Sequence, residues 1–350
     1  MILPLAVVGR SPMEEYTSRY PDDLVAALKH SVKDALAAYY ELEQLRTQFK
    51  NTSDKDSKRH DKALDVLIRE KEERLFRLVK FNDYPALVMA AYPESKFITG
   101  HDYKRLKTPV TDPILIRGIT TGDYAKQALA QGRDFYFVET GYLGNYRCDN
   151  NTTGRKIYHR IEKNAMQQSR IMDVPDDRWQ ALCKFNPDLT YRGWRKRPGS
   201  KILLIMSTDK PFEYYGDTRQ AWVDSTIATI QQHTDREIVI REKAGRGERT
   251  NDTIYDAIDN DIFAVVTYNS IAAVEAIQAG VPAFSCAPTA ASPVTTSDLS
   301  LIDSPPMLDE AVIRKWLSSV AYGQFSVNEI LTGRAWQLVQ ENELRPTFSY

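Results

Sequence analysis

Apolar residues in the second half of the chain occur in short runs that alternate with longer, periodically apolar stretches. The short runs have the length and composition of buried strands, and the longer stretches repeat apolar residues at helical spacing. The strand candidates are 201–206, 237–243, 262–269 and 282–288, and the helix candidates are 220–234, 250–260 and 270–280. This alternation predicts a parallel sheet with helices on both faces.

The first half alternates strands and helices less regularly. The strand candidates are 2–8, 113–118 and 134–144, with a weaker candidate at 85–92. A helix is expected between the strands at 113–118 and 134–144, from about residue 121 to residue 132. Residues 22–80 hold two stretches with helical spacing around the polar run NTSDKDSKRHDK, which predicts a helical hairpin with a solvated tip.

Residues 186–200, NPDLTYRGWRKRPGS, lack apolar periodicity and carry two prolines and two glycines, so we expect a basic linker there. The predicted fold is α/β, with two Rossmann-like domains that face a cleft and a helical hairpin inserted into the first. The expected bounds are 1–185 for the N-terminal domain with its insertion at 22–80, 201–325 for the C-terminal domain, and 326–350 for a C-terminal helix and tail.

Composition and charge narrow the class of protein. The chain has 350 residues and a net charge of −1, so no overall field draws it to nucleic acid or membrane, and any basic site must be local. Cys148, Cys183 and Cys286 are scattered, as in a reduced cytosolic protein without a cysteine metal cage. The apolar start is too short for a membrane span and has no basic leader, so we expect a first strand and a cytoplasmic protein.

Polar residues follow four strands at the predicted carboxyl edge of the second sheet. They are Ser207-Thr208-Asp209-Lys210, Arg241-Glu242-Lys243, Thr267-Tyr268-Asn269-Ser270 and Ala287-Pro288-Thr289. Asn269 or Ser270 is expected to cap the next helix, whose first N–H groups can hold an anion. Glu275 can accept two hydrogen bonds from a ribose diol, so the set suits a sugar nucleotide. Each residue also has an ordinary alternative, as a plain cap, a solvated acid or a surface charge.

The helix at 270–280 carries the pattern S-x₄-E-A-x₃-G-x-P, through Ser270, Glu275, Ala276, Gly280 and Pro282. With the strand order around it, this half resembles the nucleotide-binding half of GT-B glycosyltransferases. AVVGRSP, FYFVETGYLGN and the AYGQF of residues 321–325 are more closely similar to GT-B-like proteins of tailed phages. The resemblance covers roughly 110–335 and leaves out the hairpin at 22–80.

The resemblance implies a glycosyltransferase, of hexosyl or pentosyl type, that uses a nucleotide-sugar donor, with a UDP-sugar as the first candidate. It makes the N-terminal domain the acceptor-binding part and the C-terminal domain the donor-binding part. The donor contacts that it implies are Ser207, Arg241, Lys243, Asn269, Ser270, Glu275, Thr289 and Ser292, the last two near the diphosphate with backbone N–H groups that include Ala290. No metal is expected, because Asp259-Asn260-Asp261 precedes a strand and is typical of a turn rather than of an Asp-x-Asp metal site.

An inverting transfer requires a group that takes the proton of the acceptor hydroxyl. Glu139, at the end of FYFVE, is the first candidate, with Asp123 and His159 as alternatives. Glu139 can instead be a strand-end acid paired with a neighbouring arginine, and a retaining mechanism would leave no obvious base. Arg10 lies in the first loop expected at the cleft, and Tyr142 is expected to stack on a sugar or a base.

The acceptor is suggested by TYRGWRKRPGSK, where Arg192, Trp194 and Arg195 belong to a basic cluster with interleaved aromatic rings. Such clusters suit a nucleic-acid backbone and an unstacked base. Together with the phage resemblance, they favour a hydroxymethylated base in phage DNA as the acceptor, flipped out or otherwise exposed, in the cytoplasm of the host. A charged linker without this role is the alternative.

Two other functions remain open from the sequence. A nonhydrolysing sugar-nucleotide epimerase shares this architecture, but the C-terminal half offers only His233 for its chemistry. A nucleotide- or DNA-binding protein that has lost its catalytic role is the second. The sequence does not decide between a monomer and a homodimer.

Overall fold

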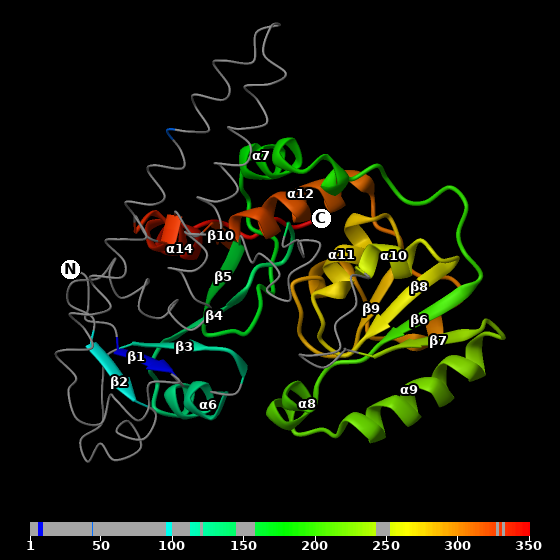
Figure 1. The fold of residues 1–350 in the computed structure, drawn as a ribbon, viewed down its shortest axis with the longest axis horizontal. Helices are drawn as coiled ribbons and strands as arrows, with labels where there is room; N and C mark the ends of the chain where they lie inside the picture. Colours follow the sequence, from blue (N-terminus) through cyan, green and yellow to red (C-terminus); the bar gives the residue numbers. More distant parts are fainter. Residues whose placement is uncertain are drawn as a thin grey trace, which may run out of the picture. The chain divides into compact units, whose positions relative to one another are not determined.

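The computed structural model describes residues 6–9, 44, 96–99, 113–119, 122–144, 158–242, 253–326, 329–330 and 333–350 (Figure 1). The chain separates into two compact units. The first unit contains Met1–Arg117, Ala128–Phe135 and Ser326–Trp336, and the second contains Gly118–Gln127, Tyr136–Phe325 and Gln337–Tyr350. The predicted hairpin at 22–80, apart from residue 44, and the strand candidate at 85–92 lie outside the described residues, as do Arg10 and Lys243.

Three short parallel strands belong to the first unit. Strand β1 (Ala6–Gly9) pairs with β2 (Lys96–Thr99) on one side and with β3 (Ile114–Arg117) on the other. Strands β1 and β3 confirm two predicted strands, whereas β2 was not predicted. Helix α6 (Gly122–Ala130) confirms the predicted helix that follows β3.

Strands β4 (Phe135–Thr140) and β5 (Tyr158–Lys163) form an antiparallel pair. Strand β4 was predicted, but β5 was not, because its sequence YHRIEK has a single aliphatic residue, Ile161, among six. Strand β5 is still largely buried. Arg160 donates from Nη1 to the carbonyl of Thr140 over 2.5 Å and from Nε to the carbonyl of Met166 over 3.1 Å.

The second unit contains a four-stranded sheet with the order β7-β6-β8-β9, in which every pair is parallel. Its strands are β6 (Lys201–Ile205), β7 (Ile238–Arg241), β8 (Ile262–Thr267) and β9 (Ala283–Ser285). The helices between them are α8 (Asp209–Tyr215), α9 (Arg219–His233), α10 (Ile254–Ile258) and α11 (Ala272–Gln278). Except for α8, all of these elements were predicted from the pattern.

Both faces of this sheet are covered, because neighbouring residues of a strand point to opposite faces. On β6, Leu203 and Ile205 pack into a core with α10, α11 and other helices. Ile202 and Leu204 pack into a second core with Phe212 of α8 and with α9. Figure 1 shows α8 and α9 on one side of the sheet and α10 and α11 on the other. The mixed α/β fold with a parallel sheet is therefore confirmed.

Further elements complete the second unit and lead into the C-terminal segment. They are α7 (Asp177–Phe185), η2 (Pro187–Leu189), η3 (Ser292–Val294), η4 (Leu299–Leu301), α12 (Glu310–Tyr322), β10 (Gln324–Ser326) and α14 (Arg334–Glu343). Helix α14 confirms the predicted C-terminal helix, whereas α7 was not predicted. Among the described residues, no helix combines the length and the apolar character needed to cross a membrane.

Residues 186–200 lie inside the second unit and pack against it. Leu189 and Tyr191 are buried in the core that contains α11 and α12. The backbone N–H of Arg195 donates to the carbonyl of Gly280 over 3.0 Å, and the indole N–H of Trp194 donates to the carbonyl of Leu308 over 2.9 Å. The apolar side chains of the segment expected to be a basic linker therefore pack against the second unit, and Arg192, Lys196 and Arg197 are exposed.

Candidate functional site

The order of the four-stranded sheet reverses at β6. The chain passes from β6 to β7 on one side and then to β8 on the other, and ligands of open α/β sheets bind beside such a reversal at the carboxyl ends of the strands. Ser207 follows β6 and Asn269 follows β8, and both side chains are buried. Ser207 Oγ lies 3.5 Å from Asn269 Oδ1, so these two predicted donor residues meet at the reversal.

The first turn of α11 differs from the prediction. Ser270 Oγ accepts a hydrogen bond of 3.2 Å from the N–H of Ala272, but the N-cap position of the helix falls on Ile271, one residue later than the prediction. The next amides donate to backbone carbonyls: that of Ala273 to Ser270, and those of Val274 and Glu275 to Ile271. Because these N–H groups already have acceptors, the structure does not show them free to hold an anion.

The loop after β9 is closed by its own hydrogen bonds. The N–H of Thr289 donates to Ser292 Oγ over 2.8 Å, and the N–H of Ala291 donates to Thr289 Oγ1 over 3.0 Å. The N–H of Ser292 donates to the carbonyl of Thr289 over 3.1 Å. The amides of Thr289, Ala291 and Ser292 therefore already have acceptors within the loop.

Gln167 joins the two loops. Its Nε2 donates to the carbonyl of Asn269 over 2.8 Å, and its Oε1 accepts from the N–H of Ala290 over 3.1 Å. The side chain is buried, with 7% of the residue exposed. Thr289 is buried as well, and its Oγ1 contacts Ser285 Oγ at 3.3 Å. Gln167 thereby fixes the loops after β8 and β9 relative to each other, a role that the sequence analysis missed.

The other predicted donor residues lie at the same sheet or in the helix above it. Arg241 ends β7 and is half-buried, and Glu275 is half-buried on α11. Asp259-Asn260-Asp261 forms the predicted turn before β8, where Asp259 pairs with Arg195. In the described part of the chain, no three acidic, histidine or cysteine residues are grouped so that they could hold a metal ion.

Tyr142, which was expected to stack on a sugar or a base, is buried, with 1% of the residue exposed. Its hydroxyl donates to Glu162 Oε1 over 2.9 Å and accepts from the N–H of Gln168 over 2.8 Å. Its backbone N–H donates to Gln324 Oε1 over 2.8 Å. Burial raises the pKa of the phenol well above 10, so it stays protonated and positions the groups around it.

Some residues of the basic-aromatic cluster pack against the second unit, and others are exposed at the surface. Arg195 donates to the carbonyl of Ile258 over 3.1 Å and to the carbonyl of Ala279 over 3.3 Å, and it pairs with Asp259 over 2.5 Å. Arg195 and Trp194, both expected at the acceptor, therefore anchor the segment to the second unit. Three exposed cations remain: Arg192, Lys196 and Arg197.

Glu139 and its alternatives occupy different environments. Glu139 is half-buried on β4 and accepts hydrogen bonds from the N–H and Oγ1 of Thr140, at 2.9 and 3.1 Å. It lies opposite Arg160 in the register of β4 and β5. Asp123 is exposed on α6, and His159 is fully buried on β5.

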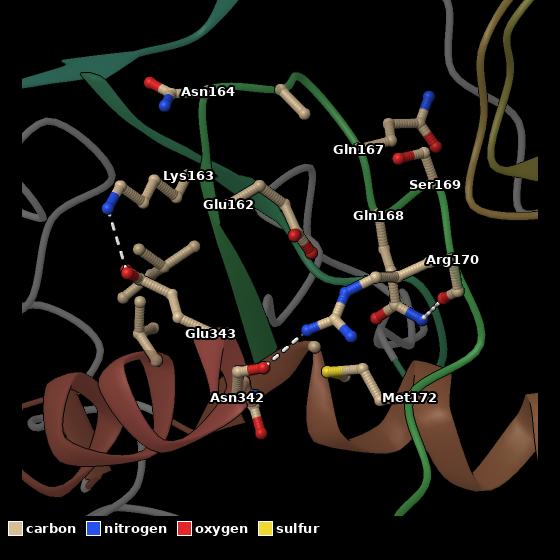
Figure 2. A pocket seen from close by; sticks show the side chains of 14 residues that line it. Glu162, Lys163, Asn164, Gln167, Gln168, Ser169, Arg170, Met172, Asn342 and Glu343 are labelled. Carbon is tan, nitrogen blue, oxygen red and sulfur yellow. Dashed lines mark hydrogen bonds and ion pairs between the residues drawn. The ribbon is translucent and has the colours of Figure 1, made fainter. Parts of the chain in front are cut away.

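The second unit contains a pocket of about 370 Å³ whose walls come from three segments far apart in the sequence (Figure 2). The segments are 161–172 on and after β5, Gly323 after α12, and 339–343 of α14. The polar lining includes Glu162, Lys163, Gln167, Gln168, Arg170 and Asn342. Because Gln167 lines this pocket and also holds the two strand-end loops, the pocket and the sheet reversal share one residue.

The lining side chains are held in place by hydrogen bonds to other elements. Arg170 donates to the carbonyl of Arg345 over 2.7 Å and to that of Asn342 over 2.5 Å. Gln168 Nε2 donates to Ser319 Oγ over 2.7 Å, and Lys163 pairs with Glu343 over 2.9 Å. The lining is therefore fixed before any ligand enters.

Glu162 is the titratable group most altered by this environment. Burial raises its pKa to about 7, while the hydrogen bond from Tyr142 and the charges of Arg160 and Arg170 lower it by less. A carboxyl group with a pKa near neutrality can take up and release a proton under physiological conditions, which is common at functional sites. The sequence analysis missed Glu162 because it overlooked β5.

The AYGQF segment at 321–325 contributes to the same region. Gln324 Oε1 accepts from the N–H groups of Tyr142 and Leu143 at 2.8 and 2.9 Å, and its Nε2 donates to the carbonyl of Leu143 over 3.0 Å. A side chain at Gly323 would overlap Gln168 Oε1 and approach Glu162 Oε1 to 3.2 Å. The segment therefore supports the pocket wall.

The fold and the site are those of an α/β protein in which polar residues lie where the strand order of the sheet reverses, beside a pocket. No protein-family model matches the chain, and no curated protein is significantly similar to it. Two similar solved structures are forms of KpsC from Thermosulfurimonas dismutans. The beta Kdo 2,4 transferase is 12% identical, with a TM-score of 0.41, over 70% of this chain and 93% of that one. The beta Kdo 2,7 transferase is 14% identical, with a TM-score of 0.43, over 75% and 97%. Identities and scores this low leave the function to be argued from the site.

Proposed function

We propose that the protein is a glycosyltransferase that moves a sugar from a nucleotide-sugar donor to a hydroxyl group. The observation that carries the proposal is the meeting of Ser207 and Asn269 at the reversal of the sheet, 3.5 Å apart, with the loop after β9 held beside them by Gln167. Ligands of open α/β sheets bind at such places, and hydroxyl and amide groups there suit the sugar and phosphate parts of a nucleotide.

Side chains rather than backbone amides would hold this donor, because the amides of the two loops already have acceptors. Arg241, at the end of β7, supplies positive charge for the phosphates, and Glu275 supplies acceptors for a ribose diol. The leaving nucleotide gains negative charge in the transition state, and a fixed cation stabilises that charge without a metal ion.

The finer parts of the proposal concern the sugar and the acceptor. We propose a hexosyl or pentosyl transfer from a UDP-sugar, without a metal. The acceptor that we propose is a hydroxymethylated base of phage DNA, and the exposed cations Arg192, Lys196 and Arg197 would contact its phosphates. Alanine substitution of these three together is expected to weaken DNA binding and to reduce its dependence on salt.

The first test is a thermal-shift panel of UDP, GDP, CDP, ADP and their sugars, with and without Mg²⁺. A ligand at 100 times its Kd adds about 2.7 kcal/mol to the stability of the folded state. We expect one nucleotide class to raise the melting temperature equally with and without Mg²⁺. Ser207→Ala should weaken its binding about tenfold, through loss of one hydrogen bond.

Ser225→Ala is the matched control, since Ser225 is exposed on α9 and its Oγ donates to the carbonyl of Trp222 within the same helix. It should bind the nucleotide as the wild type does. If no nucleotide or nucleotide sugar shifts the wild type, the donor site does not exist and the proposed function is wrong.

A further inference from the structure

We propose that the pocket around Glu162 holds the acceptor, a polar ring that bears a free hydroxyl, and that the Glu162 carboxylate takes the proton of that hydroxyl. This inference rests on the proposed function and replaces Glu139 as the base. It also assigns a ligand to the pocket, which the sequence analysis did not identify.

The geometry of Glu162 suits this task. Glu162 lines the pocket, and in Figure 2 its carboxylate points toward the same space as the guanidinium of Arg170. One oxygen, Oε1, accepts the hydrogen bond from Tyr142, whose own oxygen is held by the N–H of Gln168. These two hydrogen bonds fix the carboxylate while it still faces the pocket. By contrast, Glu139 bonds to its neighbour Thr140 and does not line the pocket.

The size and lining of the pocket indicate the class of ligand. A volume of about 370 Å³ lies at the lower end of the range for ligand pockets, which suits a single ring rather than an extended chain. The charged lining residues balance, with Glu162 and Glu343 opposed by Lys163 and Arg170, and Lys163 is already paired with Glu343. Such a lining favours a neutral molecule rich in hydrogen-bonding groups. A saccharide ring and a hydroxymethylated base share this chemistry.

Gln168 supplies a further acceptor. Its Oε1 is buried, and no hydrogen bond to it occurs among the described residues. Buried carbonyl oxygens of this kind normally have a donor, so a hydroxyl of the ligand that reached this oxygen would satisfy it. Gly323 leaves the space beside Gln168 Oε1 and Glu162 Oε1 free of a side chain.

The protonation of Glu162 supports the role. Its pKa of about 7 lets the carboxylate exist near neutral pH and still accept a proton. The charged and titratable groups around it are Arg160 of β5, Arg170 of the following loop, the phenol of Tyr142, and the Lys163–Glu343 pair that reaches α14. Of these, Tyr142 stays protonated, so Glu162 is the group expected to titrate near pH 7.

The transfer step forms one bond, breaks another and moves one proton. The acceptor oxygen forms a bond to the anomeric carbon of the donor while its proton moves to the Glu162 carboxylate. The bond from that carbon to the phosphate oxygen breaks, and its electron pair leaves with the nucleoside diphosphate. Gln167, which lines the pocket and holds the loops after β8 and β9, brings the acceptor next to the donor site.

Binding to the pocket can be tested without a donor. Saturation-transfer NMR on the full chain would use two kinds of probe, a panel of methyl hexopyranosides and 5-hydroxymethyl-2′-deoxycytidine. We expect at least one probe to bind, and the kind that binds identifies the source of the hydroxyl. Ser169→Trp should abolish this binding, because Ser169 is exposed and lines the pocket, so a large ring there would fill it.

The role of Glu162 is tested by release of nucleoside diphosphate from the nucleotide sugar that the protein binds, with and without the bound probe. Glu162→Gln keeps the size of the side chain and its contact with Tyr142. It should lower the probe-dependent rate 10²–10⁴-fold, as expected for loss of a general base, and should leave nucleotide binding unchanged. The wild-type rate should fall below pH 7 and that of Glu162→Gln should not. Glu213→Gln, on the exposed face of α8, is the control.

The outcomes separate the two proposals. If nucleotides bind but no probe does, or if Ser169→Trp binds the probe as well as the wild type, the pocket assignment is wrong and the donor site stands. If a probe binds and no nucleotide does, the proposed function is wrong, and with it the proton transfer. If Glu162→Gln retains the probe-dependent rate, Glu162 is not the base.

Discussion

Gln167 Nε2 donates a hydrogen bond of 2.8 Å to the backbone carbonyl of Asn269, which connects a pocket-lining side chain to the loop after β8. The same amide accepts from the N–H of Ala290 in the loop after β9. A neutral side chain thus links its own segment to two loops that lie 102 and 123 residues further along the chain. Four predictions follow from this and similar contacts.

Gln167→Ala should destabilise the protein and loosen both loops. The substitution leaves the carbonyl of Asn269 and the N–H of Ala290 without their partner in a buried place, which costs ~1–3 kcal/mol for each unsatisfied group. Urea denaturation would measure the free energy of unfolding. Gln180→Ala is the control, since Gln180 is exposed and its side chain donates to Asp176, four residues earlier in the chain. Equal stability of the two variants would show that the link carries little energy.

Glu162→Gln should change how stability depends on pH. The carboxyl group has a pKa of about 7 in the folded protein and about 4.5 when it is free, so the folded state holds its proton more tightly. This contribution to stability is present below pH 4.5 and is lost as the pH rises through 7. The glutamine variant has no carboxyl group at this position, so it should not lose this stability as the pH rises. We therefore compare the free energy of unfolding of Glu162→Gln with that of the wild type at each pH. Because the side chain is partly exposed, we expect this difference to be only ~1–2 kcal/mol more favourable to the variant at pH 8 than at pH 4.5.

A wild-type curve parallel to that of Glu162→Gln between these pH values would mean that the carboxyl group titrates at its ordinary pKa. The Glu213→Gln control should follow the wild type throughout, because Glu213 is exposed.

Arg195→Ala should destabilise the second unit without a specific effect on nucleic acid. Its guanidinium bonds to the carbonyls of Ile258 and Ala279, at the ends of α10 and α11, and pairs with Asp259. Loss of these charge-assisted bonds should cost ~1.5–3 kcal/mol. Lysine should not restore the stability, because it lacks the planar fork that reaches several acceptors.

Arg197→Ala is the control for this prediction, because Arg197 is exposed in the same segment. It should leave the melting temperature unchanged. A loss of DNA binding in Arg195→Ala at a temperature where the variant is still folded would contradict the structural role.

Gly280→Ala should be more harmful than Gly216→Ala. Both glycines have left-handed backbone angles, with φ of +76° and +81°. The added Cβ at Gly280 would overlap the carbonyl oxygen of Gly193, whereas at Gly216 it would meet nothing within 4 Å. Gly216→Ala should therefore cost only the backbone strain, ~1 kcal/mol, and Gly280→Ala should cost several times more. Similar melting temperatures for the two variants would show that residues 193–195 move away easily.

The sequence predicted the four-stranded sheet well because its strands have continuous apolar runs, and β6, β8 and β9 are buried on both faces. Ser207, Asn269 and Thr289 could be placed at one edge for the same reason, since the carboxyl ends of parallel strands lie together. The hydrogen bonds of the loops could not be predicted, because Ser270 and Ser292 can cap a turn or hold a ligand with the same hydroxyl group.

The pocket escaped prediction because strand β5 has a polar sequence. The burial of Arg160 depends on the carbonyls of Thr140 and Met166, which no periodicity reveals. Tyr142 shows the reverse error. Its place after a strand and beside two glycines suggested an exposed ring, but the amide of Gln324 and the carboxyl of Glu162 draw it inside.

The pocket also sets an order of events during synthesis. Residues 161–172 emerge from the ribosome long before Asn342 and Glu343, which form the opposite wall. A nascent chain that ends before α14 would expose Glu162 and Lys163 without the partner wall, even where the four-stranded sheet had already folded. The pocket can therefore bind a ligand only after the sheet has formed and α14, the last helix among the described residues, has been translated.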